Sequence, residues 1–428
     1  TYKDVKDTSV VAMFKAIPSK ESQFIFDAAA SNPLSKEVYY MAWTTTPWTL
    51  PSNLGLTVGP NIEYALIATY NPYTAMPVNV VLAKALVSKY FKEEGLSLTS
   101  FAEGDKMVPW KELATFKGSQ LDGLRYEQLM PFEANNPTNI EGDPFKIIIG
   151  DFVTTEDGTG IVHTSPAFGA DDYKVGQKNN LGIITLVDRA GKFIDGVGEF
   201  AGRFVKNYKD EKDFQDVNVD ISVKLKKENR AFKVEKYEHN YPHCWRTDKP
   251  ILYYPLDAWF IKTTAVKDRM VELNKTINWK PKSTGEGRFG NWLENMVDWN
   301  LSRSRYWGTP LPIWRTEDGT EETCIGSIDE LTAGFLAAKE KGFNKEVQLQ
   351  IVDGKLDVDL HKPFVDQIEI LSPTGKPMQR VSDLVDVWFD SGAMPYAQWH
   401  YPFENKDLVD KGLAFPADFI AEGVDQTR

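Results

Sequence analysis

Two prolines, Pro47 and Pro51, interrupt a stretch that otherwise has the composition of β-strands. The residues before them, EVYYMAWTTT at 37–46, are mostly aromatic or β-branched, and LGLTV and IEYALIATY follow soon after. Proline lacks the N–H that a sheet ladder needs and fixes its own φ, so the chain must leave the sheet here. We therefore predict strands on either side of a rigid, hydroxyl-rich loop, Trp43–Asn53.

A second loop of the same character lies further along the chain at Gly158–Tyr173, with the sequence GTGIVHTSPAFGADDY. KIIIGDFVTT and GIVHTSP predict a hairpin around a turn at 156–158. Asp171 or Asp172 is expected to cap the helix that follows. Both loops combine small hydroxyl donors, a proline and one strong polar group, which suits a pocket that holds a small polar ligand.

The chain changes character after a basic run at 223–236. The part before it is β-rich with few long helices, which predicts a compact barrel. The part after it alternates helical and strand patterns, and Ser327 with Glu330 predicts a capping box at a helix start. We expect a mixed α/β protein with divisions at 1–236, 237–317, 318–383 and 384–428.

The composition excludes several classes of protein. The hydrophobic content of 42% and charged content of 26% are ordinary for a globular protein. No apolar run approaches the length of a membrane span, and no secretory leader is visible. Cys244 and Cys324 belong to no CxxC pair, so neither a disulfide framework nor a zinc ribbon is expected. These features predict a cytoplasmic location, and both ends of the sequence suggest part of a longer protein.

The net charge of −12 argues against a protein that coats nucleic acid nonspecifically. It does not argue against a protein that binds RNA through a local basic patch. The candidates for such a patch lie in the basic run, and an ordinary solvated face is the alternative interpretation. They are Lys224, Lys226, Lys227, Arg230, Lys233 and Lys236.

The absence of common catalytic and nucleotide-binding motifs restricts the reactions that this sequence could catalyse. There is no GxSxG, HExxH or P-loop pattern, and no GxGxxG followed by an acidic residue. A hydrolase of this sequence must therefore attack an already labile bond with a positioned water, and an aminoacyl ester of a ribose is such a bond.

In that interpretation Asp172 anchors the α-ammonium group, and Asn53 holds an ester or ribose oxygen. The expected pocket lining is Thr44, Thr45, Thr46 and His163. Taken singly, each of these residues has a plainer explanation as a helix cap, a strand former or a core histidine.

Taken together, WTTTPWTLPSNLGLTVGP and GTGIVHTSPAFGADDY resemble the editing insertion of the isoleucyl-tRNA synthetases, which are class I enzymes. The sister enzymes for valine and leucine have an Arg-containing TTRP loop and a PAHDxxD loop instead. YPHCWR, SRSRYWGTP, DVWFDSG and AEGVDQ match further landmarks of the family, so the resemblance covers essentially the whole chain.

This resemblance implies a β-barrel-rich editing domain, then part of a Rossmann-like catalytic domain with a small inserted subdomain. It implies that Trp388 and Gln426 touch isoleucine and that Glu422 touches the adenylate. The HIGH and KMSKS signatures are absent, so ATP and Mg are expected only for the full-length enzyme, and editing is expected to need no cofactor. Because Cys244 is followed by Trp, Arg and Thr rather than completing a CxxC, no metal site is expected.

The resulting hypothesis is proofreading by a second, smaller sieve that hydrolyses Val-tRNA(Ile). The expected partners are tRNA(Ile), valine, isoleucine and aminoacyl-adenylate, and the protein is expected to be a monomer. The alternative is a non-catalytic tRNA-binding module derived from a synthetase.

Overall fold

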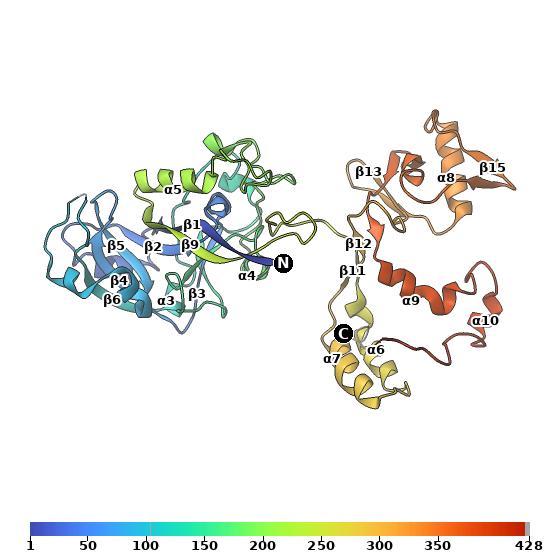
Figure 1. Ribbon diagram of the computed structural model, residues 1–428, viewed down its shortest axis with the longest axis horizontal. Coiled ribbons are helices and arrows are strands. Elements are labelled where there is room, and N and C mark those ends of the chain that lie inside the picture. The colour runs from blue at the N-terminus through green and yellow to red at the C-terminus, as the bar shows by residue number, and fades with distance from the viewer. Residues whose placement is uncertain (103, 424–428) are drawn as a thin grey trace. The chain divides into compact units, whose positions relative to one another are not determined.

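The computed structural model describes residues 1–102 and 104–423. They divide into two compact units, Thr1–Pro255 and a second unit that begins at Leu256 (Figure 1). None of the described helices is both long and apolar enough to cross a membrane.

The first unit is built, within its described residues, on one sheet of nine strands. The strands are β1 (Tyr2–Lys15), β2 (Val38–Thr44), β3 (Gly55–Val58), β4 (Glu63–Tyr70), β5 (Pro77–Ala83), β6 (Lys111–Lys117), β7 (Lys146–Ile149), β8 (Ile161–Thr164) and β9 (Ala231–Pro242). The α-helices are α1 (Gln23–Ala29), α2 (Val87–Tyr90), α3 (Gly118–Leu121), α4 (Ala170–Lys178) and α5 (Val217–Lys227). The 3₁₀ helices are η1 (Pro47–Ser52), η2 (Lys84–Leu86), η3 (Glu93–Ser97), η4 (Pro137–Asn139) and η5 (Gly198–Phe200).

The strand order is β6-β4-β5-β2-β8-β3-β7, and β1 pairs with both β2 and β9. β1 follows β2 antiparallel along one edge, from Val10 opposite Thr44 to Lys15 opposite Tyr39. The other edge of β2 is shared by two parallel strands, β5 beside residues 38–40 and β8 beside Trp43. The sheet therefore divides along β2, and the end of β2 is held by β8 alone on that edge.

Both faces of the central part of this sheet are buried, as the second half of β1 illustrates. Val10, Ala12 and Phe14 enter the larger hydrophobic cluster, whereas Val11 and Met13 enter a second one. Successive side chains of a strand point to opposite faces, so a strand covered on both sides is apolar throughout. This explains the continuous apolar run VVAMF in the sequence.

Three local predictions for this unit need correction. β7 and β8 do not form a hairpin, because β3 lies between them and pairs with both. Asp171 and Asp172 do not cap α4, because Gly169 is the N-cap and both acids lie in the first turn. The division expected after residue 236 falls inside β9, whose pairing with β1 continues to Pro242, so the unit extends to Pro255.

The second unit contains short elements. Its strands are β10 (Phe260–Ile261), β11 (Trp299–Asn300), β12 (Ser302–Arg303), β13 (Ile313–Thr316), β14 (Glu322–Cys324), β15 (Gln350–Val352), β16 (Lys355–Asp357), β17 (Ile370–Leu371), β18 (Pro377–Arg380) and β19 (Leu384–Val385). Its helices are α6 (Lys267–Asn274), α7 (Phe289–Glu294), α8 (Ile328–Glu340), α9 (Val387–Ala397) and α10 (Lys406–Asp410), with 3₁₀ helices η6 (Thr263–Val266) and η8 (Val365–Gln367) and the π-helix η7 (Thr284–Arg288).

The mixed α/β class with a β-rich first part is confirmed. In the second unit, every strand pair that the structure describes is antiparallel, so the Rossmann-like parallel sheet stays a prediction. The inner divisions at 317/318 and 383/384 also stay predictions. The serine half of the capping box expected at α8 is present, since the Ser327 hydroxyl accepts the N–H of Glu330 at 3.1 Å, whereas the Glu330 carboxylate accepts the N–H of Gly326 at 2.7 Å.

Trp314 holds together a small hydrophobic cluster of the second unit between α8 and the sheet of β13, β14, β17 and β18. It is 1% exposed, and its indole N–H donates to Ile368 O at 2.8 Å. We expect Trp314→Ala to lower the free energy of unfolding of this unit by about 3–5 kcal/mol, measured by urea unfolding. Trp307→Ala is the control, because Trp307 is 69% exposed; equal losses in the two variants would contradict this account.

Candidate active site

The two loops singled out in the sequence meet because β2 and β8 are parallel neighbours. Trp43 of β2 lies opposite Val162 of β8. Parallel strands have their carboxyl ends at the same edge of a sheet, so the chain leaves both strands at one place. The loop that begins at Thr44 and the loop that begins at Ser165 therefore start side by side.

Direct contacts join the two loops. The Ser165 hydroxyl donates to Ser52 O at 3.0 Å, and both serines are buried. The rings of Trp48 and Phe168 pack edge to face with centroids 4.8 Å apart. An aromatic pair of this geometry adds to the stabilisation from burial alone.

The proline-rich loop forms the 3₁₀ helix η1, with Pro47 at its start, where a missing N–H costs nothing. Two asparagines hold its backbone. Asn218 Oδ1 accepts the N–H of Trp48 at 2.9 Å, and Asn135 Nδ2 donates to Pro51 O at 2.7 Å. Asn218 belongs to α5, so this helix and the segment around Asn135 fix the shape of the loop.

His163 is at the centre of a buried hydrogen-bond network. Its Nε2 lies 3.0 Å from Thr49 Oγ1, and its Nδ1 lies 2.8 Å from Asn53 Nδ2. The Tyr126 hydroxyl donates to Asn53 Oδ1 at 2.7 Å. Burial lowers the pKa of His163 to about 4, so the imidazole is neutral at physiological pH. An imidazole that is buried and has so low a pKa is unsuited to exchanging protons with a substrate.

Asn53 is 3% exposed, and its amide nitrogen also donates to Gly55 O at 2.8 Å. Its polar atoms are therefore taken up by the protein. One of these bonds orients His163, and the direct contact that the sequence suggested, with an ester or ribose oxygen, stays a prediction.

The three consecutive threonines differ from one another. Thr44 Oγ1 accepts the N–H of Thr46 at 3.1 Å and lies 3.1 Å from Thr46 Oγ1. Thr46 Oγ1 in turn lies 3.3 Å from Thr49 Oγ1. Among the described residues the Thr45 hydroxyl has no hydrogen-bond partner, and Thr45 is partly exposed, so it is the one that remains available to a ligand.

Asp172 lies in the first turn of α4 and is partly buried. Burial raises the pKa of this carboxyl to about 7; Asp171 raises it further, and a backbone hydrogen bond from Ser165 acts in the opposite direction. Lys174 pairs with Asp171, and no cation within the described ranges forms an ion pair with Asp172. A partly desolvated carboxylate without a counter-ion is the electrostatic complement of an ammonium group.

The absence of a side chain at Gly169 leaves the space that the Asp172 carboxylate occupies. An ideal Cβ at residue 169 would lie 2.4 Å from Oδ2 of Asp172. The carboxylate is thus folded back against the N-cap of α4, towards the positive end of the helix. Any side chain at residue 169 would displace it.

The structure therefore brings together Thr44, Thr46, Asn53 and His163, and links them to Asp172 through Ser165 and Ser52. Sequence reasoning missed Thr49 and Tyr126. Thr49 could have been found, because it lies three residues after Thr46 on a short helix. Tyr126 carries no signal, since nothing in its neighbourhood distinguishes it from a core tyrosine.

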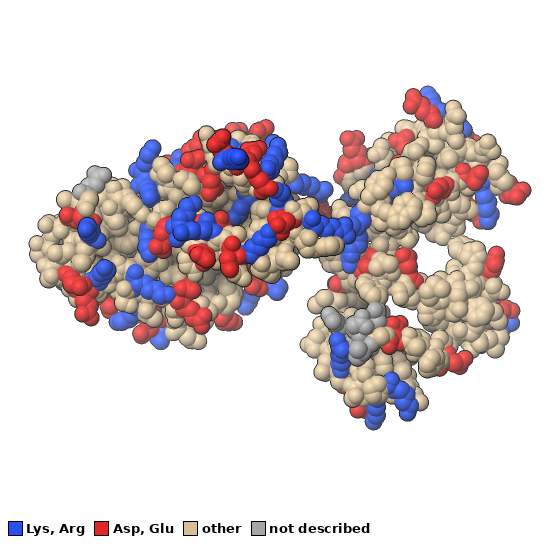
Figure 2. Space-filling view, in the orientation of Figure 1, with Lys and Arg blue, Asp and Glu red and all other residues tan. Residues whose placement is uncertain are grey.

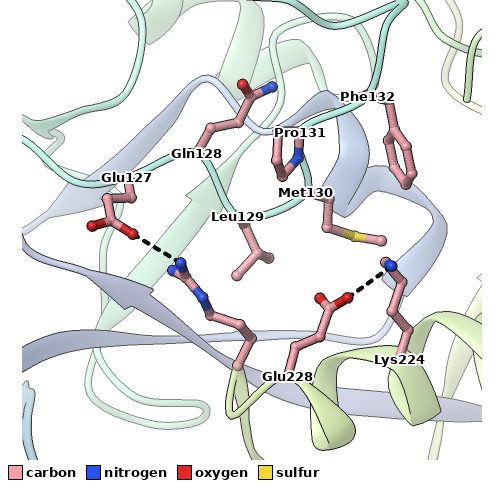
Figure 3. A pocket seen from close by; sticks show the side chains of 9 residues that line it. Glu127, Gln128, Leu129, Met130, Pro131, Phe132, Lys224 and Glu228 are labelled. Atoms are coloured by element: carbon pink, nitrogen blue, oxygen red, sulfur yellow. Dashed lines mark hydrogen bonds and ion pairs between the residues drawn. The ribbon is translucent and has the colours of Figure 1, made fainter.

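Three of the six basic residues of the run form ion pairs with carboxylates. Lys224 pairs with Glu228 at 2.8 Å, Arg230 with Glu127 at 2.9 Å, and Lys233 with Glu235 at 2.9 Å. The first two pairs line a pocket of about 610 Å³ beside residues 127–132 (Figure 3). On the face of the first unit in Figure 2, basic and acidic side chains alternate.

The other three cations of the basic run are less constrained. Lys226 lies over the ring of Tyr73 at 4.5 Å, and Lys236 donates to Thr8 Oγ1 at 2.8 Å. Lys227 is exposed. The tRNA-binding role predicted for all six residues of the basic run stays a prediction.

The residues predicted for a synthetic site belong to the second unit. Trp388 is on α9 and is 54% exposed, and Glu422 is exposed. Gln426 lies outside the described residues. Across the described ranges, no three His, Cys, Asp or Glu side chains are grouped as metal ligands would be, and the expectation of a metal-free site stays a prediction.

Comparison with known families decides the affiliation of the chain. The family described as tRNA synthetases class I (I, L, M and V) matches residues 2–428. The chain belongs to this family. The resemblance inferred from the sequence motifs is thereby confirmed.

Curated relatives agree with this assignment. The chain is 57% identical to an isoleucine–tRNA ligase of Cytophaga hutchinsonii, with 100% of this chain and 38% of the relative aligned. It is 53% identical to that of Bacteroides fragilis, covering 40% of it, and 42% identical to that of Treponema denticola, covering 36% of it. The chain thus spans about two-fifths of the length of these relatives.

Solved structures give only loose matches. A leucyl-tRNA synthetase CP1 domain, GlLeuRS-CP1, aligns with 54% of this chain and 98% of its own at a TM-score of 0.38 and 15% identity. The editing domain of the P. knowlesi cytosolic leucyl-tRNA synthetase aligns with 55% of this chain and 98% of its own at a TM-score of 0.36 and 12% identity.

Asp172 should make stability depend on pH. Because its folded-state pKa of about 7 lies above the usual value, ionisation costs folding free energy above pH 7, and this cost fades as pH falls towards 4. We expect Asp172→Asn to raise the free energy of unfolding at pH 8 by about 2–4 kcal/mol and to leave it unchanged near pH 4, measured by urea unfolding. Asp171→Asn is the matched control; a pH-independent difference for Asp172→Asn would contradict the assigned burial.

Proposed function

We propose that this chain is the part of an isoleucine–tRNA ligase that proofreads, hydrolysing Val-tRNA(Ile) to valine and tRNA(Ile). The observation that carries the proposal is the partly buried carboxylate of Asp172, which forms no ion pair among the described residues and follows the turn at Ser165 that contacts the hydroxyl-rich loop at η1. Family membership and the relatives' names support the choice of tRNA and amino acid. In the whole protein, ATP and Mg would serve aminoacylation of tRNA(Ile) with isoleucine through the aminoacyl-adenylate.

In the proposed reaction, Asp172 binds the α-ammonium of the valyl group as a carboxylate. The ammonium would lower the pKa of Asp172 from its value of about 7, because an opposite charge favours the ionised form. Binding would thereby satisfy both the carboxylate, which otherwise lacks a counter-ion, and the ammonium. This pairing fixes the ester carbonyl relative to the loop.

Thr45 is the proposed donor to the ester and to the attacking water, and Thr44 and Thr46, whose hydroxyls contact each other within the loop, hold it in place. The ester is activated by its own ammonium, so orientation supplies most of what the reaction needs. Water adds to the carbonyl carbon, the bond to the ribose oxygen breaks, and a proton from the attacking water is transferred to that oxygen. No protein nucleophile takes part, and neutral His163 with both ring nitrogens bonded acts as support.

Selection against isoleucine would be steric. A hydrophobic pocket rejects a smaller side chain only weakly, a limit for which isoleucine and valine are themselves the standard illustration. A second pocket that admits valine and excludes the larger isoleucine would remove the valine that the first pocket fails to reject. Trp48, packed on Phe168 and held by Asn218, makes the proposed wall rigid enough for such exclusion.

The test is deacylation of Val-tRNA(Ile) by the 428-residue chain. Asp172→Asn keeps the shape of the side chain and removes its charge, so we expect a loss on the order of 100-fold or more. Asp171→Asn is the matched control, because Asp171 is its exposed neighbour and should leave the rate unchanged. A near-parental rate in Asp172→Asn would remove the anchor role, and binding without hydrolysis by the parent would favour the non-catalytic alternative.

The tRNA backbone is proposed to contact Lys226, Lys227 and Lys236. Each cation that meets a phosphate releases counter-ions, so binding weakens with salt. We expect the double variant Lys226→Ala/Lys227→Ala to weaken tRNA binding and to reduce the slope of log affinity against log salt by about 1–2. Lys233→Ala is the control, since Lys233 is paired with Glu235; an unchanged slope in the double variant would exclude these lysines.

A further inference from the structure

We propose that Asn53, held by Tyr126, is a positioning residue that keeps His163 in the form protonated on Nε2 alone, so that His163 serves as a fixed hydrogen-bond donor to Thr49. The placement of protons follows from the contacts of the first unit. Its consequence for hydrolysis rests on the proposed function.

The orientation of the Asn53 amide is set by two groups of opposite character. Gly55 O can only accept, and it lies 2.8 Å from the amide nitrogen. On the other side, Tyr126 donates its hydroxyl proton to the amide oxygen at 2.7 Å. Reversing the amide would place two oxygens together at Gly55 and lose the bond from Tyr126. The nitrogen of Asn53 therefore faces His163.

The tautomer of His163 follows from this orientation. An amide nitrogen only donates, so Nδ1, 2.8 Å away, must be the bare, accepting nitrogen. A neutral imidazole carries one N–H, which is then on Nε2. This N–H points at Thr49 Oγ1, 3.0 Å away. An imidazolium would set an N–H against an N–H at Asn53, which reinforces the effect of burial.

The direction of donation continues into η1. Thr49 Oγ1 receives the imidazole N–H and donates its own proton to Thr46 O at 2.8 Å, a carbonyl that can only accept. This series of hydrogen bonds thus ends at the carbonyl groups of Gly55 and Thr46, and each N–H and O–H in it has one assigned acceptor. It holds the turn of η1 that presents Thr45 and Thr46.

Tyr126 is suited to orienting the Asn53 amide because no water can replace Asn53 as the partner of its hydroxyl. It is 1% exposed and packs edge to face on Phe14, with ring centroids 5.3 Å apart. Water is therefore excluded from its hydroxyl, and burial holds the pKa of Tyr126 well above its usual value, so the proton stays available for donation.

The experiment is ¹⁵N NMR of the 428-residue chain labelled in its histidine side chains. The chain has five histidines, so single variants of the other four assign the signals of His163 by elimination. We expect the parent to show a protonated Nε2 and a bare Nδ1. A protonated Nδ1 in the parent would overturn the proposal outright, whether or not the chain hydrolyses any ester.

Asn53→Asp supplies the sharpest variant. A carboxylate cannot donate, so Nδ1 of His163 should become protonated; a bare Nδ1 in this variant would overturn the role of Asn53. In Tyr126→Phe the amide loses its donor, and the His163 signals should shift or divide into two sets; unchanged signals would remove Tyr126 from the unit. Thermal unfolding by circular dichroism establishes that each variant is folded.

Tyr40→Phe is the matched control, because Tyr40 is also fully buried in the same cluster but its hydroxyl has no partner within the described residues. It should leave the His163 signals and deacylation unchanged. Tyr126→Phe should slow deacylation of Val-tRNA(Ile) by on the order of tenfold through misplacement of η1. If Tyr126→Phe shifted the His163 signals but deacylated at the rate of the parent, the link between the tautomer and hydrolysis would be overturned. If the parent itself failed to deacylate, that would count against the proposed function alone.

Discussion

The candidate site depends on one parallel contact, Trp43 opposite Val162, between β2 and β8. β1 occupies one edge of β2 along most of its length, and β5 occupies the start of the other edge, so only the last residues of β2 remain for β8. Because the two strands run in the same direction there, their following loops leave the sheet together. The proline-rich helix η1, the turn at Ser165 and the first turn of α4 then need only short-range contacts to assemble.

Burial acts on the two titratable groups of the site in contrasting ways. His163 has a partner for each ring nitrogen, so desolvation makes it a neutral structural group. Asp172 has no counter-ion among the described residues, so desolvation leaves a carboxyl whose ionised form is unsatisfied until a cation arrives. The same physical effect therefore gives one residue that stays neutral with both ring nitrogens bonded and, under the proposed function, one that gains a counter-ion when the ligand binds.

Much of the first unit could be predicted from sequence because the signals were local. The prolines of η1, the strand-forming runs and the loop residues Thr44 to Asn53 all follow from residue chemistry within a short window. The hairpin of β7 and β8 was wrong because β3, distant in sequence, inserts between them, and register between distant strands leaves no local trace. Tyr126 was missed for the same reason, and the pairing of Lys224 with Glu199 and of Arg230 with Glu127 could not be foreseen because these acids come from other segments.

Gly169 has a consequence for natural variation in this family of enzymes. It carries no functional group, yet the space left by its missing Cβ is occupied by the Asp172 carboxylate. Alanine at residue 169 would retain each polar residue of the site, and its methyl group would push the Asp172 carboxylate out of this position. If the proposed function holds, the choice between two amino acids then depends on a residue that has no side chain.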